Sequence, residues 1–146
     1  MDDKLKRSII LEHYQHPLHR GLIDDDSYLK SNTNSDSCID EIDLMVKIEN
    51  GKIKDIKFDG EACAICTSST SIMIDTLIGK TVEEVNLIYN NYLNMIEEKE
   101  YDAELLEQAL VYEDISKQPN RKKCALLPWW GMEKIIKQIE GVDNNE

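Results

Sequence analysis

The sequence has no long hydrophobic run. Near the N-terminus, the apolar stretch from Ile9 to Leu11 returns to charged residues at once, so it is too short for the apolar part of a signal peptide. No window approaches the roughly 20 apolar residues that are needed to cross a bilayer. We therefore expect a cytoplasmic protein, and we exclude the classes of secreted and membrane-spanning proteins.

Basic charge is also scarce. The chain carries 17 Lys and Arg against 29 Asp and Glu, which gives a formal net charge of −12. Such a chain repels phosphate backbones and anionic lipid headgroups. We therefore do not expect nucleic acids or membrane surfaces as partners.

Internal repeats and low-complexity linkers are absent as well. A chain of 146 residues is long enough for one sizeable core, so we expect a single domain over residues 1–146, with 141–146 as a frayed tail. The four cysteines are too few and too scattered to suggest a disulfide framework. In a reducing cytosol they indicate metal binding or catalysis.

The first half of the chain predicts one helix and a small sheet. Residues 3–17 have apolar residues at helical spacing, and Pro17 must end that helix. Residues 39–60 alternate apolar and polar side chains on both sides of Asn50-Gly51, a pair that favours a tight turn, so they predict a β-hairpin. Residues 27–34 predict a further strand at its edge.

The second half predicts helices. Small and apolar residues over 64–77 favour a helix packed closely on the sheet, and Thr81 with Glu84 forms a capping-box pattern at the start of the next. Residues 103–115 predict another, more exposed helix, and 121–141 a last helix that is interrupted or restarted at Pro128. The expected fold class is α+β, a small antiparallel sheet packed against several helices.

Three cysteines and one aspartate are the candidate metal ligands. Cys38, with Asp40 beside it, and Cys63 flank the predicted hairpin, whose two ends are necessarily close. Cys124, at the expected start of the last helix, would join them if that helix packs there. Three thiolates and a carboxylate suffice for tetrahedral Zn²⁺. The alternatives are buried thiols that act as small hydrophobic groups, and a turn carboxylate at Asp40.

Cys66 lies one helical turn beyond Cys63. We interpret it as a packing thiol in preference to a fourth or exchanging metal ligand. A thioredoxin-like redox pair is disfavoured, because that motif requires a βαβ unit and the hairpin upstream is antiparallel.

The histidines and tryptophans receive structural interpretations. His13, His16 and His19 fall at the end of the first helix, far in sequence from any cysteine, and we expect them to be exposed there. Trp129 and Trp130 are expected to be a core and a surface aromatic residue of the last helix, and Trp130 could also contact a partner.

The residues around the cysteines resemble a known family. "SCID", "FDGEACAI" and "RKKCALLPW" follow one another in order, after His13-Tyr14, Pro17 and Gly21. This pattern resembles the NifU N-terminal family of iron–sulfur cluster assembly proteins, which also has the IscU-like scaffolds, and within it most nearly the SufU-type zinc-dependent sulfurtransferase branch. The resemblance implies the SufE/NifU-like fold.

Residue by residue, the resemblance implies that Cys38, Asp40, Cys63 and Cys124 bind zinc. One departure from the family is Ile39, which replaces the glycine between the first two ligands. Lys123 stands where the IscU-type proteins typically carry a histidine. Lys123, together with an insertion-length stretch over 82–120, favours the SufU-type branch.

The implied function is acceptance of persulfide sulfur from a SufS-type cysteine desulfurase, a pyridoxal-phosphate enzyme, with Cys38 as the sulfur acceptor. The resemblance further implies that the desulfurase can supply a histidine to the zinc, and that downstream iron–sulfur assembly proteins are partners. Two alternatives stay open: a scaffold that builds a transient [2Fe–2S] cluster on the same ligands, and a purely structural zinc module.

Overall fold

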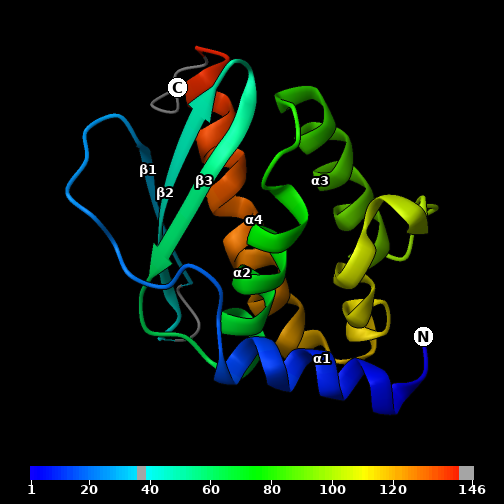
Figure 1. Ribbon diagram of the computed structural model, residues 1–146. Coiled ribbons are helices and arrows are strands. Elements are labelled where there is room, and N and C mark those ends of the chain that lie inside the picture. The colour runs from blue at the N-terminus through cyan, green and yellow to red at the C-terminus, as the bar shows by residue number, and fades with distance from the viewer. Residues whose placement is uncertain (36–38, 142–146) are drawn as a thin grey trace.

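The computed structural model describes residues 1–35 and 39–141, which form an α+β arrangement in which helices pack on one antiparallel sheet (Figure 1). The predicted fold class is therefore confirmed. The elements, in chain order, are α1 (Asp3–Gln15), β1 (Leu29–Asn34), β2 (Glu41–Glu49), β3 (Lys52–Asp59), α2 (Ala64–Leu77), α3 (Val82–Ile96), the 3-10 segments η1 (Ala103–Leu105), η2 (Glu107–Tyr112) and η3 (Ile115–Lys117), and α4 (Pro119–Ile139).

The sheet has the order β1-β2-β3 and is antiparallel throughout. The predicted hairpin is confirmed: Asn50 and Gly51 both have positive φ angles, 54° and 75°, as the tight turn between β2 and β3 requires. Alternate residues of β2, among them Leu44 and Val46, are buried on the face that α2 and α4 cover (Figure 1). The predicted edge strand is also confirmed, as β1.

Both edges of the sheet are covered. On the β1 edge, Lys134 donates from its Nζ to the carbonyl of Asn32 at 2.7 Å, and Gln138 donates from its Nε2 to the carbonyl of Lys30 at 2.9 Å. On the β3 edge, the amide of Gly21 donates to the carbonyl of Phe58 at 2.7 Å.

Local sequence signals account for the helix ends. The side chain of Asp2 accepts from the amide of Leu5 at the start of α1, which ends at Gln15, before Pro17. At the start of α3, the predicted capping box is present. The side chain of Thr81 accepts from the amide of Glu84 at 3.1 Å, and the side chain of Glu84 accepts from the amide of Thr81 at 3.0 Å. None of the helices within the described ranges is both long and apolar enough to span a membrane.

The expected exposed helix over 103–115 is wrong. This stretch forms the short 3-10 segments η1, η2 and the start of η3. Glu107, the first residue of η2, has a φ of 49°, which an α-helix cannot accommodate. The segment also contributes side chains to the protein core. These buried side chains recur at every third position, which is the period of a 3-10 helix: Leu106, Ala109, Tyr112 and Ile115. Val111 is buried as well.

The last helix is continuous, contrary to the expected interruption at Pro128. It begins earlier than expected, with Pro119 in its first turn, so Cys124 lies five residues inside α4 and not at its start. Near Pro128, the carbonyl of Ala125 accepts hydrogen bonds from Tyr92 at 2.8 Å and Ser69 at 2.7 Å. These side chains tie α2 and α3 to the part of α4 where proline removes a backbone donor.

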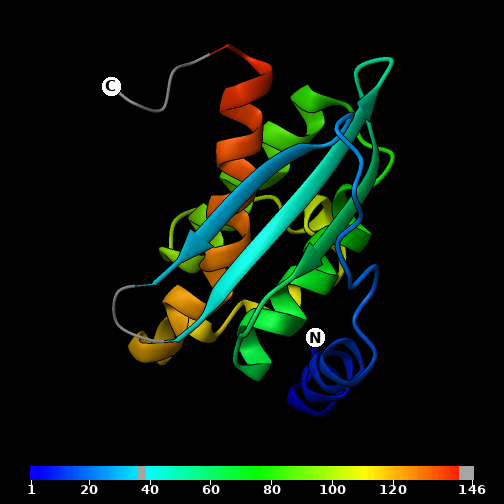
Figure 2. The ribbon, with the colours of Figure 1, turned by 90° about the vertical axis from the view of Figure 1, so that its left-hand side faces the viewer.

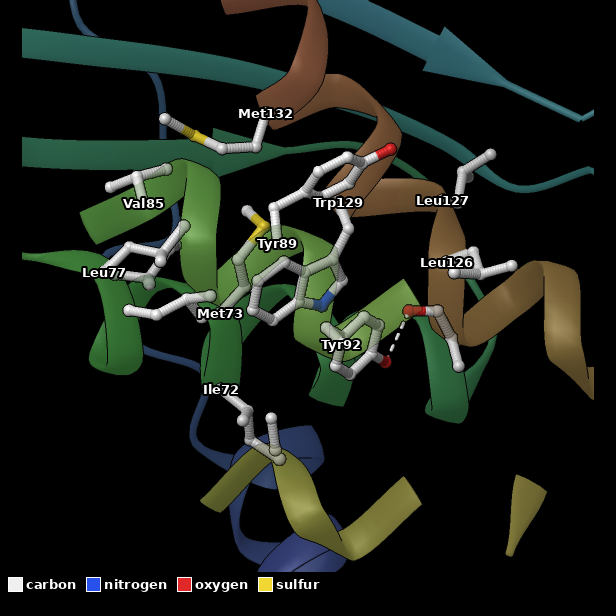
Figure 3. Packing of buried hydrophobic residues seen from close by; sticks show 14 of the residues in the cluster. Ile72, Met73, Leu77, Val85, Tyr89, Tyr92, Leu126, Leu127, Trp129 and Met132 are labelled. Carbon is white, nitrogen blue, oxygen red and sulfur yellow. Dashed lines mark hydrogen bonds between the residues drawn. The ribbon is translucent and has the colours of Figure 1, made fainter. Parts of the chain in front are cut away.

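Aromatic stacking strengthens the same region. The ring of Trp129 lies on that of Tyr92 with centroids 4.2 Å apart and planes 15° apart (Figure 3). Trp129 is fully buried and Trp130 is half-buried, so the expected core and surface positions are confirmed.

Helix α2 lies at the centre of the helical layer and is lined with small polar residues. Its buried serines and threonines have hydrogen-bond partners, which allows close packing without unsatisfied hydroxyls. Ser71 binds the Nδ1 of His13 at 2.7 Å, and Gln108 binds the Nε2 at 2.8 Å. His13 is therefore a buried link between α1, α2 and η2, and the expectation that it would be exposed is wrong; His16 and His19 are exposed.

Gly60 sets the path of the chain from β3 to α2. Its φ of +141° suits glycine, and an added Cβ would lie 2.0 Å from the carbonyl oxygen of Glu41. Beside this contact, the amide of Glu41 donates to the carbonyl of Glu61 at 2.8 Å. Gly60 thus lets the segment that leads into α2 lie directly against the start of β2.

We expect Gly60→Ala to lower the free energy of unfolding by at least about 2 kcal/mol, because the methyl group would clash with backbone atoms that cannot move independently. Gly51→Ala is the matched control, since Gly51 also has positive φ but has no atom within 4 Å of the added Cβ. It should cost only about 1–2 kcal/mol. Urea unfolding measures both; equal losses would mean that the backbone angle alone constrains Gly60.

Candidate metal centre

Three of the four predicted ligands lie together. Asp40 precedes β2, Cys63 caps α2 and Cys124 lies in the second turn of α4. One ligand atom from each falls within 4.8 Å of the others. Figure 2 shows why: β2, α2 and α4 all begin at the same end of the molecule.

Asp40 is held between the protein interior and the other two residues. Its side chain is only 2% exposed. One carboxylate oxygen, Oδ1, accepts a hydrogen bond from the amide of Cys63 at 2.8 Å. The other, Oδ2, is buried and has no hydrogen-bond partner among residues 1–35 and 39–141. A buried carboxylate oxygen without a partner is costly unless a cation or a donor meets it.

Cys63 is the exposed member of the group. It is the N-cap of α2, and its Sγ accepts from the amide of Cys66 at 3.4 Å, a sulfur version of an N-cap hydrogen bond.

Cys124 is half-buried in α4. The pKa of its thiol is raised to about 12, first by burial and then by the neighbouring Cys63 thiol and Asp40 carboxylate. Three groups that each carry negative charge when ionised are thus crowded together. A divalent cation between them would reverse this repulsion, because metal binding favours the thiolate form.

The donor set suits a borderline-soft metal. In a tetrahedral zinc site with Zn–S bonds of ~2.3 Å, two sulfur ligands lie ~3.8 Å apart. The group here, with ligand atoms no more than 4.8 Å apart, needs only small side-chain shifts to close around such an ion. Two thiols with one carboxylate are compatible with zinc or iron and unlike the all-oxygen sites of Mg²⁺ or Ca²⁺.

Cys66 is separate from this group. Its side chain is fully buried in the hydrophobic core, which agrees with the interpretation as a packing thiol, and its sulfur is not among the clustered ligand atoms of the described chain. Within "EACAIC", the exposed thiol at the helix cap and the buried one a turn later therefore have different environments.

The predicted ligand and sulfur acceptor Cys38 lies outside the described residues, so its role remains a prediction. Ile39, next to it, is 82% exposed, an unusual position for a large aliphatic side chain. The close backbone approach at Gly60 was not predicted from the sequence. Gly60 lies in "FDGEAC", where Asp-Gly between a strand and a helix indicates a special backbone conformation.

Comparison with known proteins identifies the family. The sequence pattern of the NifU-like N-terminal domain matches residues 5–125. The zinc-dependent sulfurtransferase SufU of Bacillus subtilis is 34% identical over 95% of this chain and 94% of the relative. The iron–sulfur cluster assembly scaffold protein IscU of Thermotoga maritima is 34% identical over 89% of this chain and 91% of the relative.

Solved structures agree. A crystal structure from Fervidobacterium islandicum, described as a candidate scaffold protein of the SUF system, superposes with a TM-score of 0.82 at 34% identity, covering 86% of this chain and 91% of its own. The N-terminal part of a NifU-like protein from Brucella abortus shares the fold, with a TM-score of 0.84 at 21% identity over 95% and 96% of the two chains. The chain belongs to the NifU-like N-terminal domain family.

The contrast between the two neighbouring thiols is testable. In native protein treated with a chelator, iodoacetamide should modify Cys63 at least about tenfold faster than Cys66, because only Cys63 presents its sulfur to solvent. Peptide mapping by mass spectrometry gives both rates, and unfolding in urea should make them similar. Comparable rates in the native protein would contradict the core position of Cys66.

Proposed function

We propose that this chain is a zinc-containing protein of iron–sulfur cluster biogenesis that accepts persulfide sulfur from a cysteine desulfurase. The observation that carries this proposal is the group of Asp40, Cys63 and Cys124, with a buried carboxylate oxygen that lacks a partner in the described chain. Such an oxygen beside two thiols is a fitting ligand set for a metal ion. The similarity to a zinc-dependent sulfurtransferase over nearly the whole chain supports it.

Cys38 is proposed as the fourth ligand. Only Ile39 separates it from Asp40, so covalent geometry alone keeps the two Cα atoms within ~7 Å of each other. When bound, zinc would hold the cysteine sulfurs as thiolates and make them unreactive until a ligand is exchanged.

Cys38 is also the proposed sulfur acceptor. Its thiolate attacks the outer sulfur of a cysteine persulfide on the desulfurase, a new S–S bond forms on Cys38, and the donor's S–S bond breaks. The donor cysteine leaves as a thiolate with the bonding electron pair, so the step consumes no oxidant or reductant. Cys38 lies in the polar, turn-rich sequence "NSDSCID", whereas Cys63 is the N-cap of α2 and Cys124 lies within α4.

Two rival functions use the same residues. A scaffold would receive iron and sulfide as cargo and assemble a [2Fe–2S] cluster on these ligands, and the equally identical Thermotoga IscU favours it. Against it stand Lys123 beside Cys124 and the long stretch that holds α3 and the 3-10 segments. A structural zinc module would keep its function if Cys38 were replaced by another good ligand.

The proposed partners follow from this role. They are a pyridoxal-phosphate-dependent desulfurase of the SufS type and the iron–sulfur assembly proteins that receive the sulfur, in the cytoplasm. The net charge of −12 supports protein partners over nucleic acid and membrane surfaces.

Metal content tests the ligand set. We expect about one Zn²⁺ per purified chain, with most of it lost in Cys63→Ser and retained in the matched control Cys66→Ala. Asp40→Asn should lose part of the metal, because it keeps an oxygen for the Cys63 amide but removes the charge. Elemental analysis measures all three. Retention in Cys63→Ser together with loss in Cys66→Ala would overturn the assignment.

The sulfur acceptor can be identified directly. After incubation with a cysteine desulfurase and cysteine, peptide mapping should find the added sulfur, a mass increase of about 32 Da, mainly on the peptide that contains Cys38. Cys38→Ser should abolish the label, whereas Cys66→Ala should leave it unchanged. A clear majority of the label on Cys63, Cys66 or Cys124 would refute the assignment to Cys38.

A further inference from the structure

A cleft of about 700 Å³ lies beside the metal centre, between α1, the start of α2 and the segment 111–121. Two of its lining residues, Ala64 and Ile65, directly follow Cys63 in α2, and a third, Arg121, lies about one turn before Cys124 in α4. The helices that position two proposed ligands therefore also form walls of this cleft, which we call the α1 cleft.

The interior of the α1 cleft is largely apolar. Ile10 and Ile65 line it together with the buried side chain of Tyr112. At its opening, α1 presents Leu11 and Tyr14, which are 52% and 46% exposed and lie three residues apart on one helix face. Exposed apolar side chains beside an apolar cleft are typical of a binding surface.

The charges at the cleft favour an acidic occupant, because its lining has four basic side chains, Lys6, Arg7, Lys117 and Arg121, and two acidic ones, Asp3 and Asp114. Lys6 is neutralised within the protein, because its Nζ lies 2.6 Å from Asp114 and 3.6 Å from Glu113. The guanidinium groups of Arg7 and Arg121 are different: within the described ranges, neither makes an ion pair or a side-chain hydrogen bond. The cleft thus carries two arginines without an ion pair in the described ranges, although the chain as a whole has a net charge of −12. Arginine side chains match carboxylates in geometry and charge.

We propose that the α1 cleft docks an amphipathic, acidic segment of the protein that donates sulfur to the metal centre. This inference rests on the proposed function and adds the surface by which the donor is recognised. An aliphatic or aromatic side chain of that segment fills the apolar interior, and its carboxylates pair with Arg7 and Arg121. Because the cleft shares α2 and α4 with the metal centre, a segment bound there brings the donor next to the thiols.

Two pairs of substitutions on α1 test the proposal. Leu11→Ser and Arg7→Glu alter the cleft, whereas Leu5→Ser and Lys4→Glu are matched controls, because Leu5 is 48% exposed and neither control residue lines the cleft. We expect the first pair to weaken binding to a cysteine desulfurase by at least about tenfold, and the controls by less than about twofold. Isothermal titration calorimetry measures the affinities, and the metal content of each variant checks that the centre is intact.

Sulfur loading separates the two proposals. Inorganic polysulfide, which needs no docking, should load sulfur equally onto wild type and all four variants, whereas desulfurase with cysteine should load Leu11→Ser and Arg7→Glu more slowly. No sulfur on the wild type with desulfurase would refute the proposed function itself. Normal loading of wild type, with cleft variants that bind and load as the controls do, would refute the docking site alone. So would cleft substitutions that change self-association, measured by analytical ultracentrifugation, and leave desulfurase affinity unchanged.

Discussion

The hydrogen bond from the amide of Cys63 to the carboxylate of Asp40 joins two segments that lie 23 residues apart. It fixes the start of β2 against the start of α2, and the close passage of Gly60 past the carbonyl of Glu41 makes that approach possible. The bond also determines which oxygen of Asp40 remains for a metal ion. This hydrogen bond therefore holds the Asp40 carboxylate beside Cys63, and Cys124 completes the group from α4.

Helix α2, which begins at this junction, is packed at the centre of the helical layer. Its small hydroxyl-bearing residues let α1, α4 and the 3-10 segments approach closely, and the hydroxyl of Ser71 alone contacts the ring of His13 and the amide of Leu18. The helix therefore enters the metal centre from a position that is packed on several sides.

Local signals predicted the elements whose ends are fixed by local interactions. The Asn50-Gly51 turn and the Thr81 capping box depend on neighbours in sequence, so the hairpin and α3 were predicted correctly. The stretch 103–115 was wrong because its conformation is set by tertiary burial, and its three-residue spacing of apolar side chains resembles an amphipathic helix. His13 was wrong for a similar reason, since Ser71 and Gln108 are remote in sequence.

The candidate site was likewise predicted from the sequence only in part. Asp40, Cys63 and Cys124 were singled out from the sequence, and their convergence was expected from the hairpin and the last helix. The Asp40 oxygen that has no partner in the described part of the chain, and the different burial of Cys63 and Cys66, could not be predicted, because they depend on how three segments pack. The early start of α4 at Pro119 also places Cys124 inside a helix, beyond the first-turn amides that lack intrahelical partners and could cap a side chain.

The side chains along β1 have a consequence for assembly. Lys134 and Gln138 occupy the carbonyls of Asn32 and Lys30, which would otherwise accept hydrogen bonds from a strand of another molecule. On the opposite edge, the residues before β1 occupy the same type of group on Phe58. Growth of the sheet from one copy to the next, the route to fibrils and swapped dimers, therefore requires these contacts to break first.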